Sequence, residues 1–593
     1  MCGYGVPVNL ARRALTTAVC SVLLPLSLPL SPALLPPATA AGKPHHKVTV
    51  RAGSGSVHQW PAYGAKIHRF AVVPTSAANR SLIIKATTSD PHGTVLVNGR
   101  PVKSGRATTV RGLRAGDEVS VIIDDRAGHS AQSWVYLPST FPRLSTKGTL
   151  DEGDDHVFVT LGNFLTKTPY ETVVDGHAVP SWFEQGNGSD LKPVRRGKTR
   201  YSLARSAVGG GYRIDELDRR FRTIRSHQLS GVPASTDFHD SEVLPNGRTL
   251  LLGYDADQRG GQGYLDAVIQ IVDRGGDTEF TWNSKDHVDP SEAYVDGGFG
   301  DYAHINSLQY LPDSGDILAS FRNLSQVMLI AGPSDPDHVT GEVIWRLGGE
   351  RNDFTFVKDP LGGNCAQHMA RLLPNGHLTL FDNGSRDDQS GAIGKQSADM
   401  CPNPANPDGP RIARPQTRVT EYRLNTNDPG NLRARLVWEF APTNRYSAFA
   451  GSQERLADGR TFVGWAQANP ADGTPTREPV ASLVTAKGKE RWRLFGSGWF
   501  SYRAAIGPSP DRVAPKVTIS APRKGATYHR GAKVRLRFRC TDTGGAGLNR
   551  CSGSVAYGHR LPTTPGTHSV KVTATDRDGN RTKRKVTYRV TRR

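Results

Sequence analysis

Short apolar runs alternate with turn residues along most of the 593-residue chain. Between residues 47 and 140, apolar runs at 81–84, 94–97 and 118–123 are separated by turn signals such as Asn98-Gly99. Runs of this length, rich in β-branched residues and bounded by Gly, Asn and Asp, are typical of strands. The pattern therefore predicts an all-β chain that begins with an N-terminal β-sandwich over residues 47–140.

A longer repeat covers residues 145–508. Its first element is Leu-Pro-Asn-Gly or a close variant followed by an apolar run, at residues 244–247, 311–315, 373–376 and 456–459. Its second element is a run that ends in Trp, at Trp182, Trp282, Trp345, Trp438 and Trp492, with a degenerate copy at 221–224. Asn-Gly and Asp-Gly turns need a positive φ and are strong hairpin signals. Six copies of such a unit predict a six-bladed β-propeller, and a row of separate β-sandwiches is the alternative.

The two ends of the chain have different patterns. Residues 513–593 again alternate, after a Pro-rich linker, and predict a C-terminal immunoglobulin-like domain. Residues 1–40 have a basic pair, Arg12-Arg13, then an apolar stretch broken by prolines, then Ala38-Thr39-Ala40. This is the pattern of a secretory signal peptide, and the prolines disfavour the alternative of an uncleaved membrane anchor. Export by the general or the twin-arginine route is left open. We expect a secreted or extracytoplasmic protein.

The cysteines fit export. Cys365, Cys401, Cys540 and Cys551 remain once the signal peptide is removed. Four cysteines in an exported protein indicate two disulfides. The simplest pairing is Cys365–Cys401 with Cys540–Cys551, because each pair then lies within one predicted domain. No C-x-x-C motif is present, so a zinc site is not expected.

The chain is basic, with 75 Lys and Arg against 55 Asp and Glu and a net charge of +20. Such a balance favours anionic partners. The positive charge is spread between the predicted strands, and no nucleic-acid-binding motif accompanies it, so we expect no nucleic-acid partner. The Lys- and Arg-rich C-terminal domain leaves open a contact with a cell surface or a polymer.

Histidines recur at related places in the repeat. His239 and His368 each lie eight residues before the glycine of a hairpin, and His304 lies eleven before Gly315 in a longer unit. Seven residues after the same glycines come polar residues, at Tyr254, Arg322 and Asn383. Asn306 follows His304 by two residues and is expected on the same side of its strand. Equivalent repeat positions lie at equivalent places around a propeller axis, so these side chains should converge on its central channel.

Three histidines could bind zinc, which is the competing interpretation of this site. Arg322 argues against it, because a guanidinium repels a cation and suits a tetrahedral oxyanion. The sequence therefore predicts an anion site with no metal and no cofactor. Asp240 and Glu242, next to His239, either orient that histidine or pair with arginines.

Several segments resemble one family of enzymes. They are HDSEVLPNGRTLLL (239–252), HINSLQYLPDSGDILASFR (304–322), GEVIWRLGG (341–349), QHMARLLPNGHLTLFDNG (367–384) and SYR (501–503). Over roughly 145–505 the chain resembles the PAPS-independent aryl-sulfate sulfotransferases, which are secreted six-bladed propellers. The resemblance implies an aryl sulfate donor, a phenolic acceptor and a ping-pong mechanism through a sulfohistidine.

The same resemblance assigns roles to residues. It implies that His368 is the nucleophile, that His239, His304 and Arg322 are catalytic, and that Asn306 contacts the sulfuryl group. Asn383 and Tyr254, at the other polar positions of the repeat, are expected to contact substrate. The family also has a disulfide near the nucleophile, which Cys365 could supply. Two alternatives remain open: a non-catalytic secreted propeller that binds anionic or glycan ligands, and a sulfatase-like hydrolase in which water replaces the phenol.

Overall fold

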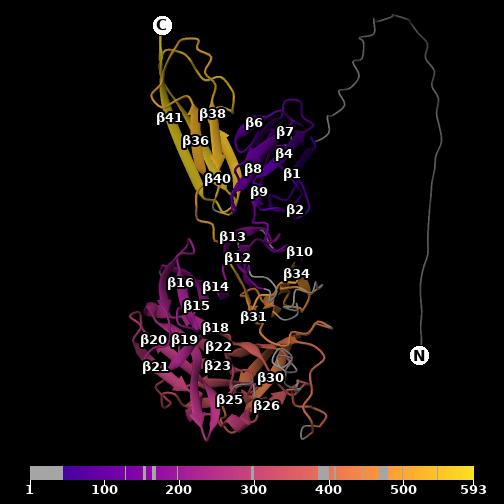
Figure 1. Cartoon of the computed structure of the whole chain (residues 1–593), viewed down its shortest axis with the longest axis vertical. Helices are drawn as coiled ribbons and strands as arrows, with labels where there is room; N and C mark the ends of the chain where they lie inside the picture. The colour runs from indigo at the N-terminus through magenta and orange to yellow at the C-terminus, as the bar shows by residue number, and fades with distance from the viewer. Residues whose placement is uncertain are drawn as a thin grey trace, which may run out of the picture. The chain divides into compact units, whose positions relative to one another are not determined.

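The computed structural model of the chain describes residues 44–592, except 127, 151–154, 163–167, 197, 296–299, 385–399, 407–408, 444, 467–477, 497 and 544 (Figure 1). The predicted signal peptide lies outside the described residues. The described part of the chain is all-β, as predicted. Its helical elements are three short 3₁₀ segments, η1 (Pro245–Gly247), η2 (Ser284–Asp286) and η3 (Pro290–Glu292). None of the helices found there has the length and hydropathy needed to cross a membrane.

The N-terminal region has two sheets that share a hydrophobic core. The first contains β1 (His46–Ala52), β4 (Ser81–Thr88) and β7 (Ala107–Arg111). The second has the order β2 (Val57–Trp60), β3 (Arg69–Pro74), β9 (Gly128–Tyr136), β8 (Glu118–Asp125), β5 (Thr94–Val97) and β6 (Arg100–Val102). Every second residue of β4, including Leu82 and Ile84, is buried against residues of the second sheet such as Val121 and Trp134.

Six further sheets follow, five of them formed mainly by consecutive strands. The first three are β14 (Ser189–Arg196), β15 (Thr199–Ser206), β16 (Tyr212–Leu217) and β17 (Thr223–His227); then β18 (Ala234–Val243), β19 (Thr249–Arg259), β20 (Gln262–Val272) and β21 (Thr278–Asn283); then β22 (Ile305–Tyr310), β23 (Ile317–Phe321), β24 (Gln326–Ile330) and β25 (Val343–Gly348). The next two have five strands each: β27 (His368–Leu372), β28 (His377–Asp382), β29 (Arg418–Asn425), β30 (Leu432–Phe440) and β26 (Phe354–Val357); and β31 (Ser452–Arg455), β32 (Thr461–Gly464), β33 (Ala481–Val484), β34 (Glu490–Phe495) and β10 (Ser145–Gly148). The sixth is β35 (Ala504–Gly507), β11 (His156–Leu161), β12 (Tyr170–Val174) and β13 (Pro180–Gln185).

The sequence repeat matches this organisation. The Leu-Pro-Asn-Gly turns connect the first and second strands of four sheets, as in β18–β19 and β27–β28. Gly247 and Gly376 have φ of 82° and 77°, the left-handed conformation that the turn requires. The recurrent Trp residues lie in the fourth strands, for example Trp282 in β21 and Trp345 in β25, and both are buried.

The first strands of the six sheets contact one another in sequence. β14 contacts β18, β18 contacts β22, β22 contacts β27, β27 contacts β31, β31 contacts β35, and β35 contacts β14. The last of these sheets joins two distant parts of the chain, because β35 pairs with β11 along residues 504–507 and 156–159. His156 and Gly507, 351 positions apart in the sequence, are thereby paired in one sheet.

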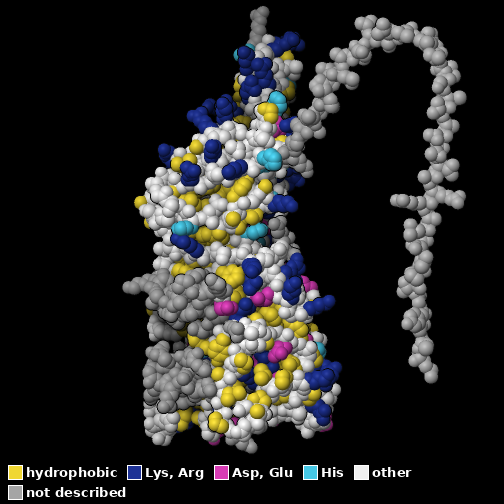
Figure 2. Space-filling model, turned by 90° about the vertical axis from the view of Figure 1, so that its right-hand side faces the viewer, with side chains coloured by type: hydrophobic (Ala, Val, Ile, Leu, Met, Phe, Trp, Pro, Cys, Tyr) yellow, Lys and Arg dark blue, Asp and Glu magenta, His cyan; other side chains and the backbone are white. Residues whose placement is uncertain are grey.

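The C-terminal region has a sheet of β36 (Lys516–Ala521) and β38 (Arg537–Thr541), and a second sheet of β37 (Thr527–His529), β41 (Arg581–Thr591), β40 (Gly566–Asp576) and β39 (Leu548–Gly553). Both predicted disulfides are present: Cys540–Cys551 links these two sheets, and Cys365–Cys401 lies just before β27. Figure 2 shows Lys and Arg side chains spread over the visible face rather than gathered in one patch, as the sequence indicated.

Candidate functional site

The three histidines singled out by the repeat lie where first strands begin or are irregular. His239 is in β18, where the pairing register shifts between Thr236 and Ser241. His304 immediately precedes β22, which has a register shift after Ile305. His368 opens β27, where the register shifts before Arg371. A bulge redirects side chains that would otherwise alternate across the strand.

Backbone strain accompanies two of these positions. His304 has a φ of 49°, and Ala366 and Met369, on either side of His368, have φ of 51° and 50°. Non-glycine residues in this region cost about 1–3 kcal/mol each and persist where surrounding contacts hold them. Such contacts are present here: Ala366 N donates to Ser325 Oγ at 3.0 Å.

His368 is 1% exposed, and both of its ring nitrogens are engaged. Nδ1 lies 2.8 Å from Oδ1 of Asn383, whose amide nitrogen donates to the carbonyl oxygens of Ser447 and Ala450. Oδ1 therefore accepts, and Nδ1 carries the proton. The backbone N–H of Ala450 donates to Nε2 at 3.1 Å, so Nε2 holds the lone pair. The site fixes a neutral imidazole in the tautomer that keeps Nε2 nucleophilic.

Electrostatics agree with a neutral imidazole. Burial, the Arg322 guanidinium and the two neighbouring histidines hold the pKa of His368 well below its usual value, against the opposing hydrogen bond to Asn383. Desolvation and like charge both disfavour an imidazolium. Both effects therefore favour the neutral ring that the hydrogen bonds of His368 indicate.

The other two histidines each face a carboxylate. Nδ1 of His239 bonds to Asp237, and Nδ1 of His304 lies 2.5 Å from Asp301. A carboxylate only accepts, so each Nδ1 is a donor. Burial alone would raise the pKa of Asp237, but the two histidines lower it, so this carboxylate stays charged. The rings of His239 and His304 are 4.9 Å apart between centroids and nearly perpendicular.

A cavity of about 530 Å³ brings the three histidines together. Its wall includes aromatic side chains from four different segments, namely Tyr212, Phe238, Phe449, and Phe500 with Tyr502. Phe238 stacks on His239 at 4.4 Å, and Tyr502 lies edge-on to His239 and His368 at 5.3 and 6.4 Å. A cavity with apolar walls and a few convergent polar groups is typical of small-molecule sites.

The other predicted site residues lie behind this wall. Tyr254 donates its hydroxyl to the Ile305 carbonyl oxygen, and Asn306 donates its amide to the Gln367 carbonyl oxygen. Arg322, 4% exposed, donates to Asn323 and affects the cavity through its charge on His368. Asn383 supports His368, as described above. Contact of these four side chains with substrate stays a prediction.

The aromatic walls, Ala450 and the two carboxylate partners were not singled out from the sequence. Asp237 and Asp301 precede their histidines by two and three residues, a spacing that was available as a signal. Tyr502 lies in the SYR segment (501–503) that resembles the family, and the sequence did not indicate what its side chain contacts. The cavity-lining segments around Phe449 and Phe500 carry no periodic pattern, because they are loops between strands.

The histidines, unlike a metal site, are not a cluster of convergent ligand atoms. Among the described residues, the one group of three or more His, Cys, Asp or Glu with ligand atoms within 4.8 Å of one another lies elsewhere, at Asp511, Asp542 and Asp576. The prediction of no metal in this cavity rests on Arg322 and stays a prediction.

Comparison with known proteins gives one family. A family model described as arylsulfotransferase (ASST) matches residues 195–493. No curated protein matches the chain. Among solved structures, the chain is similar to a protein of unknown function from Bacteroides caccae (13% identity, 60% of this chain, 99% of that chain, TM-score 0.35). It is also similar to the periplasmic gluconolactonase PpgL of Pseudomonas aeruginosa (12% identity, 73% of this chain, 99% of that chain, TM-score 0.32). Likenesses at such scores carry no conclusion about function.

Proposed function

Because the chain belongs to the arylsulfotransferase (ASST) family, we propose that it transfers a sulfuryl group from an aryl sulfate to a phenol, independently of PAPS, through a sulfohistidine on His368. The family match itself supports aryl sulfotransferase activity. The observation that carries the mechanism is the buried, neutral imidazole of His368 at an aromatic-walled cavity, with its Nδ1 proton held by Asn383 and its Nε2 lone pair accepting from the Ala450 N–H.

The proposal includes the architecture. The six sheets within residues 145–508 would be the blades of a propeller, flanked by an N-terminal sandwich (47–140) and a C-terminal immunoglobulin-like domain (513–593). Support comes from the cyclic order of contacts among the six first strands and from the pairing of β35 with β11. The two disulfides are consistent with an extracytoplasmic location, and we propose secretion after removal of residues 1–40.

In the first half-reaction, Nε2 of His368 attacks the sulfur, and the bond from sulfur to the aryl oxygen breaks. His239 or His304 gives a proton to the leaving phenolate, and Asp237 or Asp301 stabilises its imidazolium form before that transfer. The Ala450 N–H must leave Nε2 as the N–S bond forms, and a sulfuryl oxygen can then accept it. The positive charge of Arg322 favours the negative charge of the transferring group.

The second half-reaction reverses these roles. A phenol gives its proton to the histidine that acted as acid, and its oxygen attacks the sulfur. The N–S bond breaks, and the electron pair returns to Nε2 of His368. The aryl group of the donor in the first half-reaction and that of the acceptor in the second occupy the same aromatic-walled cavity. One site therefore serves both substrates.

Mass spectrometry of the mature protein tests the proposal. After brief incubation with 4-nitrophenyl sulfate and no acceptor, we expect one sulfuryl adduct on the peptide that contains His368, preserved by an alkaline quench and discharged by added phenol. Release of 4-nitrophenol without an adduct, unaffected by phenol, would instead indicate hydrolysis. Absence of both adduct and 4-nitrophenol would indicate the non-catalytic binding protein, which the family match does not favour.

The low pKa of His368 predicts a flat pH dependence for the nucleophile. A histidine with an ordinary pKa of about 6.5 loses its nucleophilic form as the pH falls through that value. The lowered pKa of His368 keeps Nε2 unprotonated, so the pre-steady-state burst of 4-nitrophenol should persist between about pH 8 and pH 6. In Asn383→Asp, a carboxylate facing Nδ1 raises this pKa, and the acid limb should move to higher pH. An unchanged limb in that variant would contradict the assignment.

The cavity wall predicts an effect on substrate binding. Phe449 lines the cavity, and its side chain takes no part in the hydrogen bonds of His368. Phe449→Ala therefore removes aromatic surface from the substrate site. We expect KM for 4-nitrophenyl sulfate to rise about 10-fold with a smaller change in kcat, since loss of uniform binding affects KM. Val339→Ala, at a side chain that is exposed on the surface, is the matched control and should leave KM unchanged. A fall in kcat with constant KM would place Phe449 outside substrate binding.

A further inference from the structure

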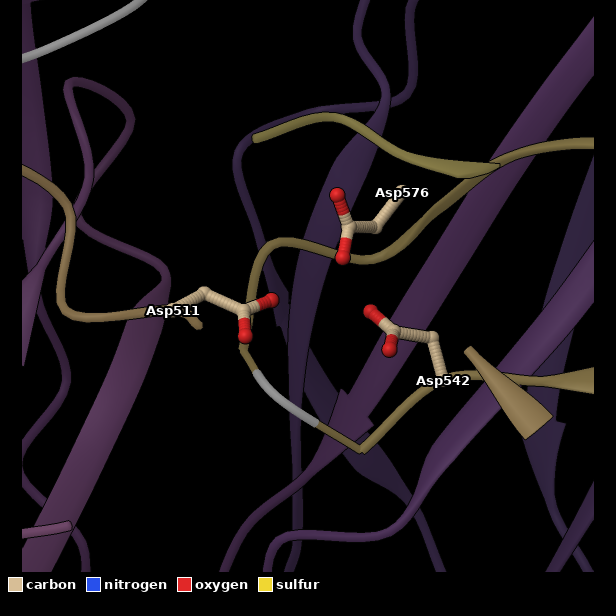
Figure 3. A group of neighbouring side chains, drawn as sticks. All are labelled: Asp511, Asp542 and Asp576. Atoms are coloured by element: carbon tan, nitrogen blue, oxygen red, sulfur yellow. The ribbon is translucent and has the colours of Figure 1, made fainter. Parts of the chain in front are cut away.

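The C-terminal region has an unusual distribution of charge. Residues 513–593 contain 19 Lys and Arg but three acidic residues, Asp542, Asp576 and Asp578. Two of these three meet a fourth carboxylate, Asp511, which precedes the region in the chain. One carboxylate oxygen from each of Asp511, Asp542 and Asp576 lies within 4.8 Å of the other two, and Figure 3 shows the three groups directed toward a common centre.

The three carboxylates come from separate places and are all buried. Asp511 lies in the linker between β35 and β36, Asp542 directly follows β38, and Asp576 is the last residue of β40. Their exposed fractions are 1%, 5% and 1%. Ionised carboxylates in such positions are strongly unfavourable unless a positive charge compensates them.

The hydrogen bonds of the group differ between Asp511 and Asp576. Asp511 accepts from the backbone N–H groups of Val513 and Ala546, at 2.8 and 2.9 Å. Asp576 Oδ1 accepts from the N–H of Asn580 at 2.8 Å. Asp576 Oδ2 has no hydrogen-bond partner among the described residues. Figure 3 shows the carboxyl group of Asp576 beside those of Asp511 and Asp542.

Within the described ranges, Asp511 and Asp576 form no ion pair, although Arg69 and Arg512 act on Asp511 from a distance. Arg69 itself pairs with Glu118 and Asp175.

We propose that Asp511, Asp542 and Asp576 bind a divalent cation of the calcium type. Hard cations prefer carboxylate and carbonyl oxygens, and calcium accepts irregular sets of six to eight oxygen ligands. The three carboxylates supply the charge, and backbone carbonyls or water complete the coordination. This site is separate from the proposed sulfuryl-transfer site and does not depend on it.

The cation would fasten the linker to the C-terminal domain. Asp511 brings the linker to the site, while Asp542 and Asp576 belong to the two sheets of the domain. Two hydrogen bonds already join the same parts: Asn580 Nδ2 donates to Asp511 O at 3.4 Å, and Ser509 Oγ donates to Asp578. One bound ion thus connects three chain segments that otherwise repel one another.

Metal titration of the full mature chain tests this proposal. After removal of divalent ions with a chelator, about 10 mM calcium should raise the unfolding temperature of one transition by at least about 5 °C, given the dissociation constants of about 10⁻⁴–10⁻³ M that are typical of extracellular calcium modules. Terbium should bind with luminescence that calcium displaces. Absence of both effects in the wild-type chain overturns the proposal.

Variants locate the site. Asp576→Asn should weaken terbium binding at least about 10-fold, since it removes one of three charged ligands. Asp458→Asn, at an exposed carboxylate in the turn before β32, is the matched control and should bind terbium as the wild type does. Equal binding by Asp576→Asn overturns the assignment. If Asp576→Asn does not fold, Asp542→Asn gives the same comparison, and 4-nitrophenyl sulfate turnover in each variant reports separately on the distant cavity.

Discussion

Replacement of His368 by Ala is expected to reduce sulfuryl transfer by about 10⁴-fold or more, because the residue that forms the covalent intermediate is removed. The adduct should disappear from the mass spectrum together with the burst of 4-nitrophenol. His239, His304 and the aromatic wall remain in the variant, so binding of the aryl sulfate should persist. The expected signature is therefore a lost kcat with a donor affinity close to that of the wild type.

The fold should survive this substitution. The imidazole of His368 makes two hydrogen bonds, to Asn383 and Ala450, and its truncation leaves a cavity next to an existing one. His377→Ala, in the next strand β28, is the matched control: its imidazole pairs with Glu421 and does not line the cavity. His377→Ala should transfer at nearly the wild-type rate. Transfer by His368→Ala within about 10-fold of the wild type would remove the sulfohistidine from the mechanism.

The repeat allowed much of this to be predicted from sequence. Turn chemistry at Gly247 and Gly376 gave the hairpins, and equal distances from those glycines placed His239 and His368 in equivalent strands. Such an inference needs local geometry and repetition, and both are encoded in short segments. The two disulfides followed from similar reasoning, because each joins cysteines within one predicted domain.

The finer geometry of the site was not accessible in the same way. The expectation for Asn306 assumed regular alternation after His304, but the register shift in β22 interrupts that alternation. Asn306 then bonds to the Gln367 carbonyl oxygen instead of lining the cavity. Bulges depend on contacts between neighbouring sheets, and a single sequence does not show which strands become neighbours.

Asp240 shows the same limit for long-range ion pairs. The sequence left open whether it orients His239 or pairs with basic residues. It pairs with Lys192 at 2.7 Å, Arg503 at 3.0 Å and Arg371 at 3.0 Å. These partners lie 48, 131 and 263 positions from Asp240 in the sequence, so no local sequence pattern indicates them. Asp240 therefore connects first strands of several sheets and does not touch the histidine.

Asp240→Asn is expected to lower the free energy of unfolding by about 3–5 kcal/mol, the cost of leaving buried charges without their partner. The carboxylate is fully buried and also accepts from the backbone N–H of Leu308 at 3.0 Å. An amide keeps the volume, but it removes the negative charge that contacts all three cations. Lys192 retains an ion pair of 2.5 Å with Asp190, and Arg503 a longer contact of 3.5 Å with the same carboxylate, which limits the loss.

The pH dependence of stability checks the same interaction. Burial alone would raise the pKa of Asp240, but Arg503, Lys192 and Arg371 hold it well below its usual value. A lowered folded pKa stabilises the fold above the unfolded pKa of about 3.9, and this contribution is lost as the pH falls through the folded value. The wild type and Asp240→Asn should therefore differ fully at pH 7 and converge in strong acid.

Calorimetric unfolding with a surface control makes the comparison. Asp458→Asn also removes one carboxylate from an ion pair, with Arg460, but its side chain is 51% exposed. Surface pairs contribute about 0–1 kcal/mol, so this variant should unfold close to the wild-type temperature. A loss in Asp240→Asn as small as that of Asp458→Asn would mean that the three cations are accommodated without Asp240. The first strands would then be held together by their apolar contacts and hydrogen bonds alone, and the histidines would keep their places without this ion cluster.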